Sequence, residues 1–142
     1  DGGEYKQKLH EYANSHALDK WIHWIPKLDF ALLPAIYKGA SLFIFPSRGE
    51  GFGIPVLEAQ AVGIPVITSN CSSLKEVGGL AAALIDPTNA AELRQTIERI
   101  LTDTELARIM VERGKQNLSK FDRKTATEKV LSLYQSTIAL NS

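Results

Sequence analysis

Residues 41–63 have the sequence SLFIFPSRGEGFGIPVLEAQAVG, in which a strand signal, a glycine-rich loop and a helix signal follow one another. The apolar run Ser41–Phe45 does not alternate with polar residues, which is typical of a strand buried on both faces. A helix is predicted over 54–62, because proline is favoured in the first turn of a helix and Pro55 lies there. Gly63 then ends this helix. The segment predicts a strand–loop–helix unit.

The rest of the chain continues this alternation of short apolar runs and helical patterns. Further strands are predicted over 21–25, 65–68 and 81–85, and helices over 4–17, 32–37, 74–77 and 124–139. Two more helices begin at the capping-box patterns Asn89-x-x-Glu92 and Thr102-x-x-Glu105. Strands that alternate with helices indicate an α/β fold with a parallel sheet. Ligands bind such sheets at the carboxyl ends of the strands, so the loops that follow strands are the candidate sites.

Composition narrows the class of protein. The length of 142 residues suits one domain. Lys plus Arg and Asp plus Glu both number 16, so the net charge is zero, without the basic excess typical of nucleic-acid-binding proteins. The single cysteine, Cys71, cannot form an internal disulfide and fits a reducing compartment. No apolar run reaches the roughly 18 residues of a transmembrane helix, and we expect a cytoplasmic protein.

The predicted loop over 47–53 has glycines at three alternate positions, Gly49, Gly51 and Gly53. Glycine lets a backbone adopt positive φ and approach a ligand closely. The loop leads into a helix N-terminus, where free N–H groups and the helix dipole favour an anion such as phosphate. Taken alone, the glycines are explained equally well by a tight turn.

Two glutamates, Glu50 and Glu58, are separated by seven residues, one in the loop and one just over a turn into the helix. If the loop folds back over the helix start, both carboxylates can face one cleft. A carboxylate accepts hydrogen bonds at both oxygens, which suits the vicinal hydroxyls of a ribose or a hexose. The pattern predicts a nucleotide sugar, with its phosphates on backbone N–H groups and its hydroxyls on carboxylates.

The run from Glu50 to Glu58 resembles the Glu-x7-Glu motif of retaining glycosyltransferases with the GT-B fold, in particular the large family 4. Other pieces of the family pattern occur in order along nearly the whole chain: Tyr37-x-x-Ala40, 42–47, Gly63-x-Pro65-Val66-Ile67, Ser72-Ser73-Leu74-x-Glu76-Val77 and Asp86-Pro87. The resemblance implies a Rossmann-like parallel sheet flanked by helices, as in the C-terminal half of a GT-B fold.

By this resemblance, residues 1–142 correspond to the donor-binding domain without its first strands and without the N-terminal, acceptor-binding domain. The start of the chain fits a truncation, because 1–4 lack the basic and apolar regions of a signal peptide and no initiator Met precedes them. Gly2-Gly3 resembles the end of the Gly-x-Gly turn that follows an earlier strand in the family. We expect the isolated fragment to be inactive.

The resemblance also implies roles for single residues. Glu50 is the expected catalytic residue, since it would contact hydroxyls of the transferred sugar near the reaction centre. Glu58 would bind the ribose hydroxyls, and Leu57 would pack near the nucleoside. The expected donor-binding residues are Gly51, Phe52, Gly53, Ile54, Leu57 and Glu58. Among them, the backbone N–H groups of 52–54 would hold the sugar or the distal phosphate.

The implied reaction is the transfer of a hexose from a nucleotide sugar, such as a UDP- or GDP-sugar, with retention of anomeric configuration. The acceptor would be a glycan, a lipid or a small molecule bound by the absent N-terminal domain. The donor phosphate would help to deprotonate the acceptor in a front-face displacement, and neither a metal nor a cofactor is expected. Any peripheral association with the inner face of the membrane would also reside in the absent domain.

The sequence departs from the family pattern at several points, such as Lys75, which stands where a proline is common. Trp24 and Pro26 stand where a glycine is usual, in the segment that would meet the base. The Arg and Lys that neutralise the pyrophosphate in the family lie upstream of the first residue here, and Arg48 does not match them.

Two other functions stay open as alternatives: a GT-B-like nucleotide-sugar epimerase, and a non-catalytic nucleotide- or sugar-binding module. The Glu-x7-Glu spacing with Gly-Phe-Gly argues against the epimerase, and neither binding nor folding alone demands both glutamates. Ser72 and Ser73 are expected to cap the helix that follows them, with a place in the sugar site as the alternative. Cys71 has no base near it in the sequence and is not expected to act as a nucleophile.

Overall fold

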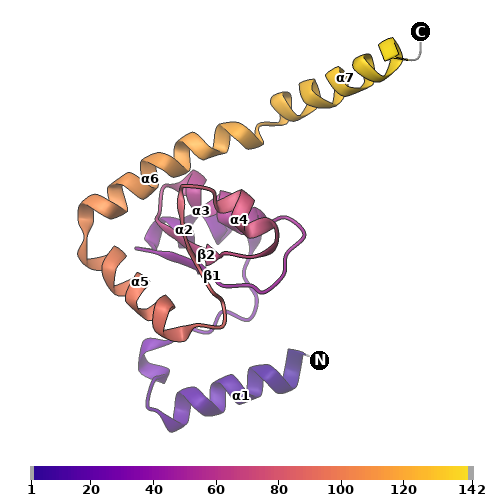
Figure 1. Cartoon of the computed structure of the whole chain (residues 1–142). Helices are drawn as coiled ribbons and strands as arrows, with labels where there is room; N and C mark the ends of the chain where they lie inside the picture. Colours follow the sequence, from indigo (N-terminus) through magenta and orange to yellow (C-terminus); the bar gives the residue numbers. More distant parts are fainter. Residues whose placement is uncertain (1, 141–142) are drawn as a thin grey trace. The chain divides into compact units, whose positions relative to one another are not determined.

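The computed structural model describes residues 2–140, which divide after Leu33 into two compact units (Figure 1). The first unit contains α1 (Gly2–Ser15) and the 3-10 helices η1 (Asp19–Trp21) and η2 (Phe30–Leu32). The helix predicted over 4–17 is therefore confirmed. The ring of His10 on α1 lies 4.2 Å from the ring of Trp24, centroid to centroid, so the segment after η1 folds back onto the helix.

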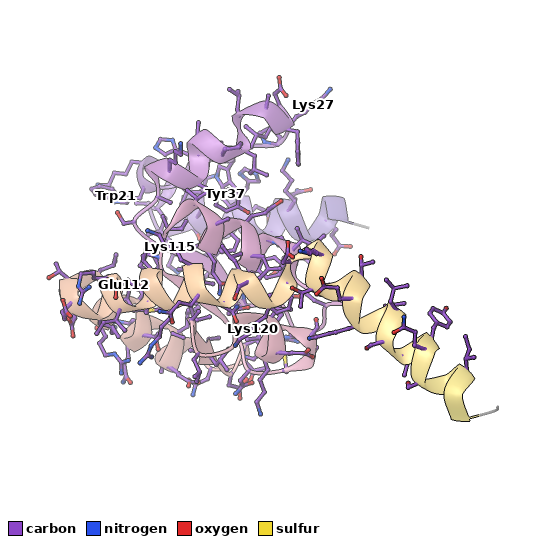
Figure 2. The ribbon with its side chains drawn as sticks, turned by 90° about the horizontal axis from the view of Figure 1, so that it is seen from above. Trp21, Lys27, Tyr37, Glu112, Lys115 and Lys120 are labelled. Atoms are coloured by element: carbon purple, nitrogen blue, oxygen red, sulfur yellow. The ribbon has the colours of Figure 1, made fainter. Side chains whose placement is uncertain are left out.

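The strand predicted over 21–25 is wrong. Trp21 ends η1, and 22–25 have no partner strand among the described residues, although Ile22 has the extended angles φ −114° and ψ 122°. The Trp21 side chain is 74% exposed (Figure 2). A strand forms only where a second strand pairs with it, so an aromatic and β-branched pattern was not sufficient here.

The second unit is built on three parallel strands, β1 (Phe43–Phe45), β2 (Val66–Ser69) and β3 (Ala82–Ile85), in the order β1-β2-β3. Ile44 lies beside Ile67, and Ile67 lies beside Ala83. This confirms the α/β class with a parallel sheet. Every residue of the central strand β2 is buried, whereas Ile44 in β1 is 37% exposed. The predicted burial of the strand at 41–45 on both faces is therefore wrong, because Phe43 and Phe45 are half-buried and Ile44 is exposed.

The helices of this unit are α2 (Leu33–Gly39), α3 (Ile54–Val62), α4 (Ser72–Gly78), α5 (Ala90–Thr102), α6 (Thr104–Leu118), the 3-10 helix η3 (Ser119–Phe121) and α7 (Arg123–Leu140). On one face of the sheet, Ile67 and Ile85 pack with Met110 of α6. On the other face, Gly78 of α4 lies so close to Thr68 that a Cβ would be 3.1 Å from the threonine methyl. Helices thus cover both faces, which explains the non-alternating sequence of β2.

The helix α3 has the bounds that the sequence predicts. Glycines with left-handed angles stand on either side of it, Gly53 with φ 110° and Gly63 with φ 86°, and Pro55 lies in its first turn.

The outer surface of α6 is charged, with exposed side chains such as Glu112 and Lys115 (Figure 2).

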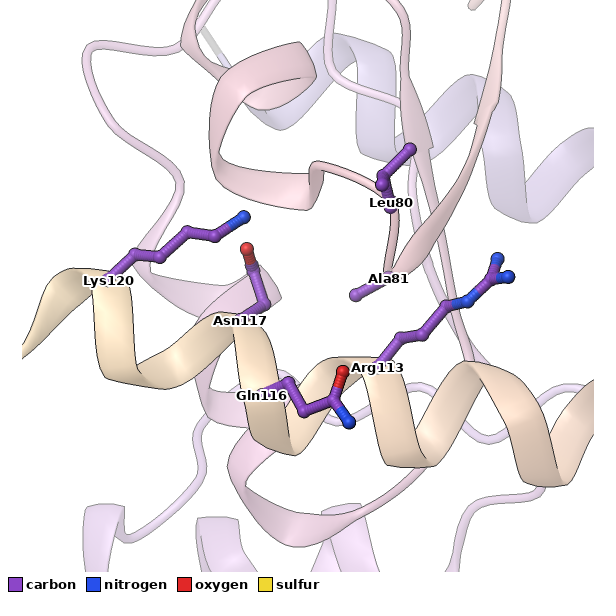
Figure 3. Close-up of a pocket in the computed structure, with 6 residues that line it drawn as sticks. All are labelled: Leu80, Ala81, Arg113, Gln116, Asn117 and Lys120. Carbon is purple, nitrogen blue, oxygen red and sulfur yellow. The ribbon is translucent and has the colours of Figure 1, made fainter.

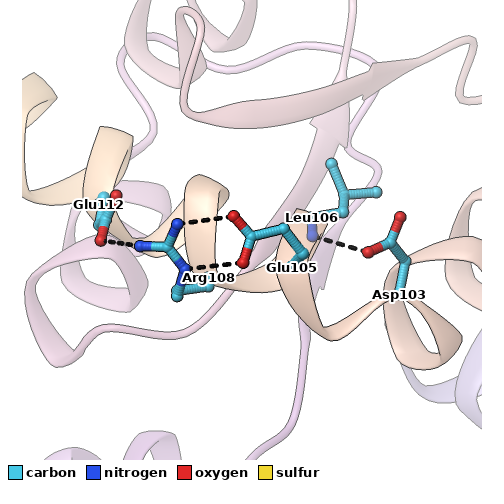
Figure 4. Close-up of polar contacts among 5 residues, drawn as sticks. All are labelled: Asp103, Glu105, Leu106, Arg108 and Glu112. Carbon is cyan, nitrogen blue, oxygen red and sulfur yellow. Dashed lines mark hydrogen bonds and ion pairs between the residues drawn. The ribbon is translucent and has the colours of Figure 1, made fainter.

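The starts of α5 and α6 give one correct and one wrong prediction. Asn89 caps α5 as predicted, because its Oδ1 accepts a hydrogen bond from the N–H of Glu92 at 3.1 Å. The cap of α6 is Asp103, whose Oδ1 accepts from the N–H of Leu106 at 2.9 Å (Figure 4). Thr102 was the predicted cap, but it is the last residue of α5.

Candidate functional site

The loops that follow the three strands meet at the carboxyl edge of the sheet. After β2, the Cys71 thiol donates a hydrogen bond to the carbonyl oxygen of Arg48 in the loop after β1, over 3.5 Å. After β3, the hydroxyl and the N–H of Thr88 donate to Asp86 Oδ1 at 2.7 and 2.8 Å. These two bonds lower the pKa of Asp86, and the positive charge of Arg48 acts in the same direction. The loop after β1 is thus bonded to the loop after β2, where the N–H of Asn70 also donates to the carbonyl oxygen of Ile85 at the end of β3, at 2.8 Å.

The main chain of Glu50 is held from two sides by the start of α4. Its N–H donates to Ser72 Oγ at 3.3 Å, and its carbonyl oxygen accepts from Ser73 Oγ at 2.8 Å. The Glu50 residue is half-buried, and its carboxylate has no hydrogen-bond or ion-pair partner within residues 2–140. A fixed backbone thus presents an unpaired carboxylate at the carboxyl edge of the sheet.

The two serines do not cap α4, contrary to the prediction. The helix follows Cys71, no side chain makes a capping bond there, and both serine hydroxyls are engaged with Glu50. Ser72 also has φ 50°, an angle that is uncommon outside glycine and asparagine. Sequence reasoning missed these contacts because they join residues 22 and 23 positions apart. The available signal was a pair of hydroxyls directly after a strand, where the loops converge.

Glu58 lies in the second turn of α3 and is half-buried. Its Oε2 accepts a hydrogen bond from the hydroxyl of Tyr37 in α2, at 3.1 Å. Tyr37 is 8% exposed, and its ring meets that of Phe43 edge to face, with 5.3 Å between the centroids. Burial raises the pKa of Tyr37 to about 12, and the Glu58 carboxylate adds to the rise. Tyr37 belonged to the sequence pattern without an assigned role, and the structure joins it to a predicted site residue.

The three loop glycines differ in what the fold requires of them. Gly53 has φ 110°, and a Cβ there would lie 2.6 Å from Leu74 Cδ2, inside the core. Both the backbone and the packing therefore require glycine at this position. Gly49 and Gly51 lie outside the left-handed region, and a Cβ on either would meet no atom within 4 Å. A tight turn therefore explains why glycine stands at position 53. It does not explain the glycines at positions 49 and 51.

The loop leads into a helix start with unpaired donors. Within the part of the chain that the structure describes, the backbone N–H groups of Phe52, Gly53 and Ile54 have no hydrogen-bond acceptor. The N–H of Val56 is the first to be paired, with the carbonyl oxygen of Gly53 at 3.0 Å. Unpaired N–H groups at a helix start carry partial positive charge and suit an anion.

Apolar side chains flank these donors. Phe52 is 45% exposed, and its ring meets that of Phe121 edge to face at 5.9 Å between the centroids. Ile54 is 59% exposed, and Leu57 is half-buried. The loop therefore offers both unpaired polar groups and accessible apolar surface beside them.

A cleft of about 290 Å³ lies elsewhere in this unit (Figure 3). It is lined by Leu80, Ala81, Arg113, Gln116, Asn117 and Lys120. Its residues belong to α6, to η3 and to the segment just before β3, so it lies at the amino end of that strand and contains none of the predicted site residues. Asn117 donates from Nδ2 to Gln60 Oε1 and to the carbonyl oxygen of Val77, at 3.0 and 2.8 Å, and so ties α6 to α3 and α4.

Comparison with known proteins identifies a family. Residues 1–117 match the family described as glycosyl transferases group 1. The O-antigen chain mannosyltransferase B of Escherichia coli is 34% identical over 115 residues, which cover 81% of this chain and 30% of the relative. The D-inositol 3-phosphate glycosyltransferase of Salinispora arenicola is 30% identical over 139 residues, covering 92% of this chain and 30% of the relative.

Solved structures of glycosyltransferases have the same fold. The sucrose-phosphate synthase of Thermosynechococcus elongatus is similar with a TM-score of 0.80 and 25% identity, over 96% of this chain and 35% of that one. Alr3699/HepE of Anabaena, solved with UDP and glucose, has a TM-score of 0.82 and 20% identity, over 94% of this chain and 37% of that one. The chain spans about a third of the length of these proteins. It belongs to the group 1 glycosyltransferases and has the Rossmann-like α/β architecture of the GT-B enzymes.

Proposed function

We propose that this chain supplies the donor site of a glycosyltransferase that moves a sugar from a nucleotide sugar to an acceptor with retention of anomeric configuration. The observation that carries the proposal is the arrangement around Glu50. Its main chain is bonded on both sides, its carboxylate is unpaired, and a helix start with free N–H groups follows it. Membership of the family supplies the reaction class, since glycosyl transfer is what its description states.

The diphosphate of the donor would lie against residues 49–54. Gly49 and Gly51 leave open space beside the backbone, which side chains would narrow. The N–H groups of 52–54 would donate to phosphate oxygens, and hydrogen bonds to charged oxygens are roughly twice as strong as neutral ones. These donors would meet part of the charge of the diphosphate. The proposal includes neither a metal nor a cofactor.

Glu58 would bind the ribose hydroxyls. An ionised carboxylate accepts about four hydrogen bonds. Among the described residues, Tyr37 donates one to Glu58 and no cation pairs with it. A half-buried carboxylate with unfilled acceptor positions is stabilised by any donor that reaches it. The two vicinal hydroxyls of a ribose provide a pair of such donors.

Glu50 would act at the reaction centre. Its carboxylate would accept hydrogen bonds from hydroxyls of the transferred sugar and would stabilise positive charge that develops on the sugar ring. In a front-face displacement, the acceptor oxygen bonds to the anomeric carbon, the nucleoside diphosphate leaves, and its phosphate takes the proton of the acceptor. The bonds from Ser72 and Ser73 would keep Glu50 in place during this step.

The acceptor, a glycan, a lipid or a small molecule, would be bound by a part of the protein outside this chain. The compartment that we propose is the cytoplasm, with peripheral contact to the membrane made by that other part. Along residues 2–140, no helix combines the length and the apolar content that crossing a bilayer requires.

Product analysis on a protein that contains this chain tests the proposal. The protein would be incubated with UDP-, GDP- and ADP-sugars and candidate acceptors, and the product examined by NMR. We expect a new glycosidic bond with the anomeric configuration of the donor. An inverted configuration would refute retention, an epimerised sugar without a new bond would indicate an epimerase, and tight binding without turnover would indicate a binding module.

A further inference from the structure

The hydrogen bond between Tyr37 and Glu58 joins two helices on either side of β1 in the sequence. Tyr37 belongs to α2 and Glu58 to α3, 21 positions apart, and the tyrosine Oη lies 3.1 Å from Glu58 Oε2. The Tyr37 ring is buried and packs edge to face against Phe43 of β1. Because the ring is buried and packed against Phe43, the position of the hydroxyl is set by the fold and not by the side chain of Glu58.

A purely structural explanation is that Glu58 only satisfies the tyrosine hydroxyl. A buried hydroxyl does need a partner, but a neutral acceptor such as a backbone carbonyl would be enough. A half-buried carboxylate without a cation is a costly choice for that task alone. The bond is therefore better explained by what Tyr37 does for Glu58.

Glutamate has several rotatable bonds, and an unrestrained carboxylate samples many orientations. Tyr37 fixes one oxygen of Glu58, and no group among residues 2–140 occupies the acceptor positions of the other oxygen. Two vicinal hydroxyls fit a carboxylate only in a narrow range of orientations, so a carboxylate held in advance loses less entropy when it binds them.

We propose that Tyr37 is a positioning residue that orients Glu58 for the ribose hydroxyls and thereby sets the preference of the site for ribonucleotides over deoxyribonucleotides. This inference rests on the proposed function, which assigns the ribose to Glu58. Because burial and Glu58 raise the pKa of Tyr37 to about 12, its hydroxyl remains a donor throughout the physiological range.

The test compares Tyr37→Phe with the parent in a protein that contains this chain. Affinities for UDP and GDP and for their 2′-deoxy counterparts would be measured by calorimetry. The phenyl ring keeps the contact with Phe43, so the fold should persist. We expect a three- to tenfold loss of affinity for the ribonucleotide, the usual size of one hydrogen bond, and little change for the deoxynucleotide. Tyr134→Phe is the matched control, since Tyr134 is 65% exposed on α7, and it should change neither affinity.

Equal losses for ribo- and deoxynucleotide, or no loss for either, would overturn the role of Tyr37. A second variant, Glu58→Gln, separates this failure from a failure of the proposed function. If Glu58→Gln abolishes the ribose preference while Tyr37→Phe retains it, the inference about Tyr37 falls and the ribose assignment stands. If Glu58→Gln leaves the preference unchanged, both fall.

Discussion

Gly51 and Gly53 are two residues apart in one loop, yet the fold constrains only one of them. Gly53 combines a left-handed φ of 110° with a Cβ position 2.6 Å from Leu74 Cδ2, which is closer than van der Waals contact allows. Gly51 has open space around it and an ordinary φ. The fold does not require glycine at position 51. A ligand that approaches the backbone there would require it, because a side chain would then be in the way.

We predict opposite outcomes for alanine at these two positions. Gly53→Ala should destabilise the fold by about 1–3 kcal/mol, through backbone strain and overpacking. Gly51→Ala should leave the melting temperature unchanged and weaken nucleotide-sugar binding by roughly tenfold, the usual effect of one misplaced methyl group. Thermal denaturation and calorimetry on both variants check this. Full affinity in a folded Gly51→Ala protein would contradict the placement of the donor at this loop.

A second residue-level prediction concerns the ionisation of Tyr37. Its pKa is raised from 10.0 to about 12, chiefly by burial and then by Glu58. The contribution of the neutral hydroxyl to stability is therefore fully present below pH 10 and is lost as the pH rises from 10 through 12. Tyrosinate absorbance should show one of the four tyrosines titrating last. Tyr37→Phe should remove that step and Glu58→Gln should move it to lower pH, whereas an unchanged curve would show that the two side chains do not interact.

At the scale of elements, the start of α4 supports the loop after β1. Ser73 donates to the carbonyl oxygen of Glu50 at 2.8 Å, and Ser72 accepts from its N–H. Both bonds hold the main chain and leave the carboxylate free. Through these two hydroxyls, the helix supports the main chain of Glu50.

We predict that Ser73→Ala lowers turnover by about three- to tenfold, the worth of one hydrogen bond, with a smaller effect on the KM for the donor. The reason is that a displaced Glu50 would still allow the nucleotide to bind. Ser119→Ala is the matched control, because Ser119 Oγ also donates to a carbonyl oxygen at 2.8 Å, that of Gln116. Steady-state kinetics would contradict this account if both serine variants behaved alike.

The junction of α5 and α6 allows a test of helix capping. Asp103→Ala should destabilise the protein by about 1 kcal/mol, because it removes the acceptor for the Leu106 N–H (Figure 4). Thr102→Ala should have a smaller effect, since its hydroxyl only returns to carbonyl oxygens of its own helix. Chemical denaturation of the two variants measures the difference, and equal losses would show that Asp103 is not the cap that matters.

Local patterns predicted the elements whose causes are local. The bounds of α3 follow from Pro55 and Gly63, and the strand near Val66 follows from a short apolar run. The strand predicted over 21–25 failed because pairing is not a property of one segment. The cap of α6 was misplaced by one residue because Thr102 and Asp103 both carry a suitable side-chain oxygen. Which of them is the cap depends on where α5 ends, and α5 ends at Thr102.

The sequence located the candidate loop, and the structure added the residues that support it. Glu50 and Glu58 were predicted from their spacing and from a family resemblance. Their partners Ser73 and Tyr37 lie 23 and 21 positions away, and only the parallel sheet and its crossover helices bring them close. Such contacts leave no periodic pattern in the sequence, so an assignment of strands and helices does not reveal them.

At the scale of the whole molecule, the second unit by itself places three loops at one edge of a parallel sheet, and the chain spans about a third of its relatives. Under the proposed function, donor binding would fall to this chain, and acceptor binding would fall to a part of the protein outside it. This chain would bind the nucleotide and its diphosphate and would place one carboxylate at the reaction centre.

An amide-resolved NMR titration of the protein with UDP, GDP and ADP and their sugar conjugates tests this assignment most directly. We predict that one base produces selective shifts at Gly51, Phe52 and Gly53, while Gly114, which packs against Gln60 in the core, does not shift. Binding that leaves 51–53 unshifted, or that shifts residues around the cleft of Arg113 and Asn117 instead, would contradict it.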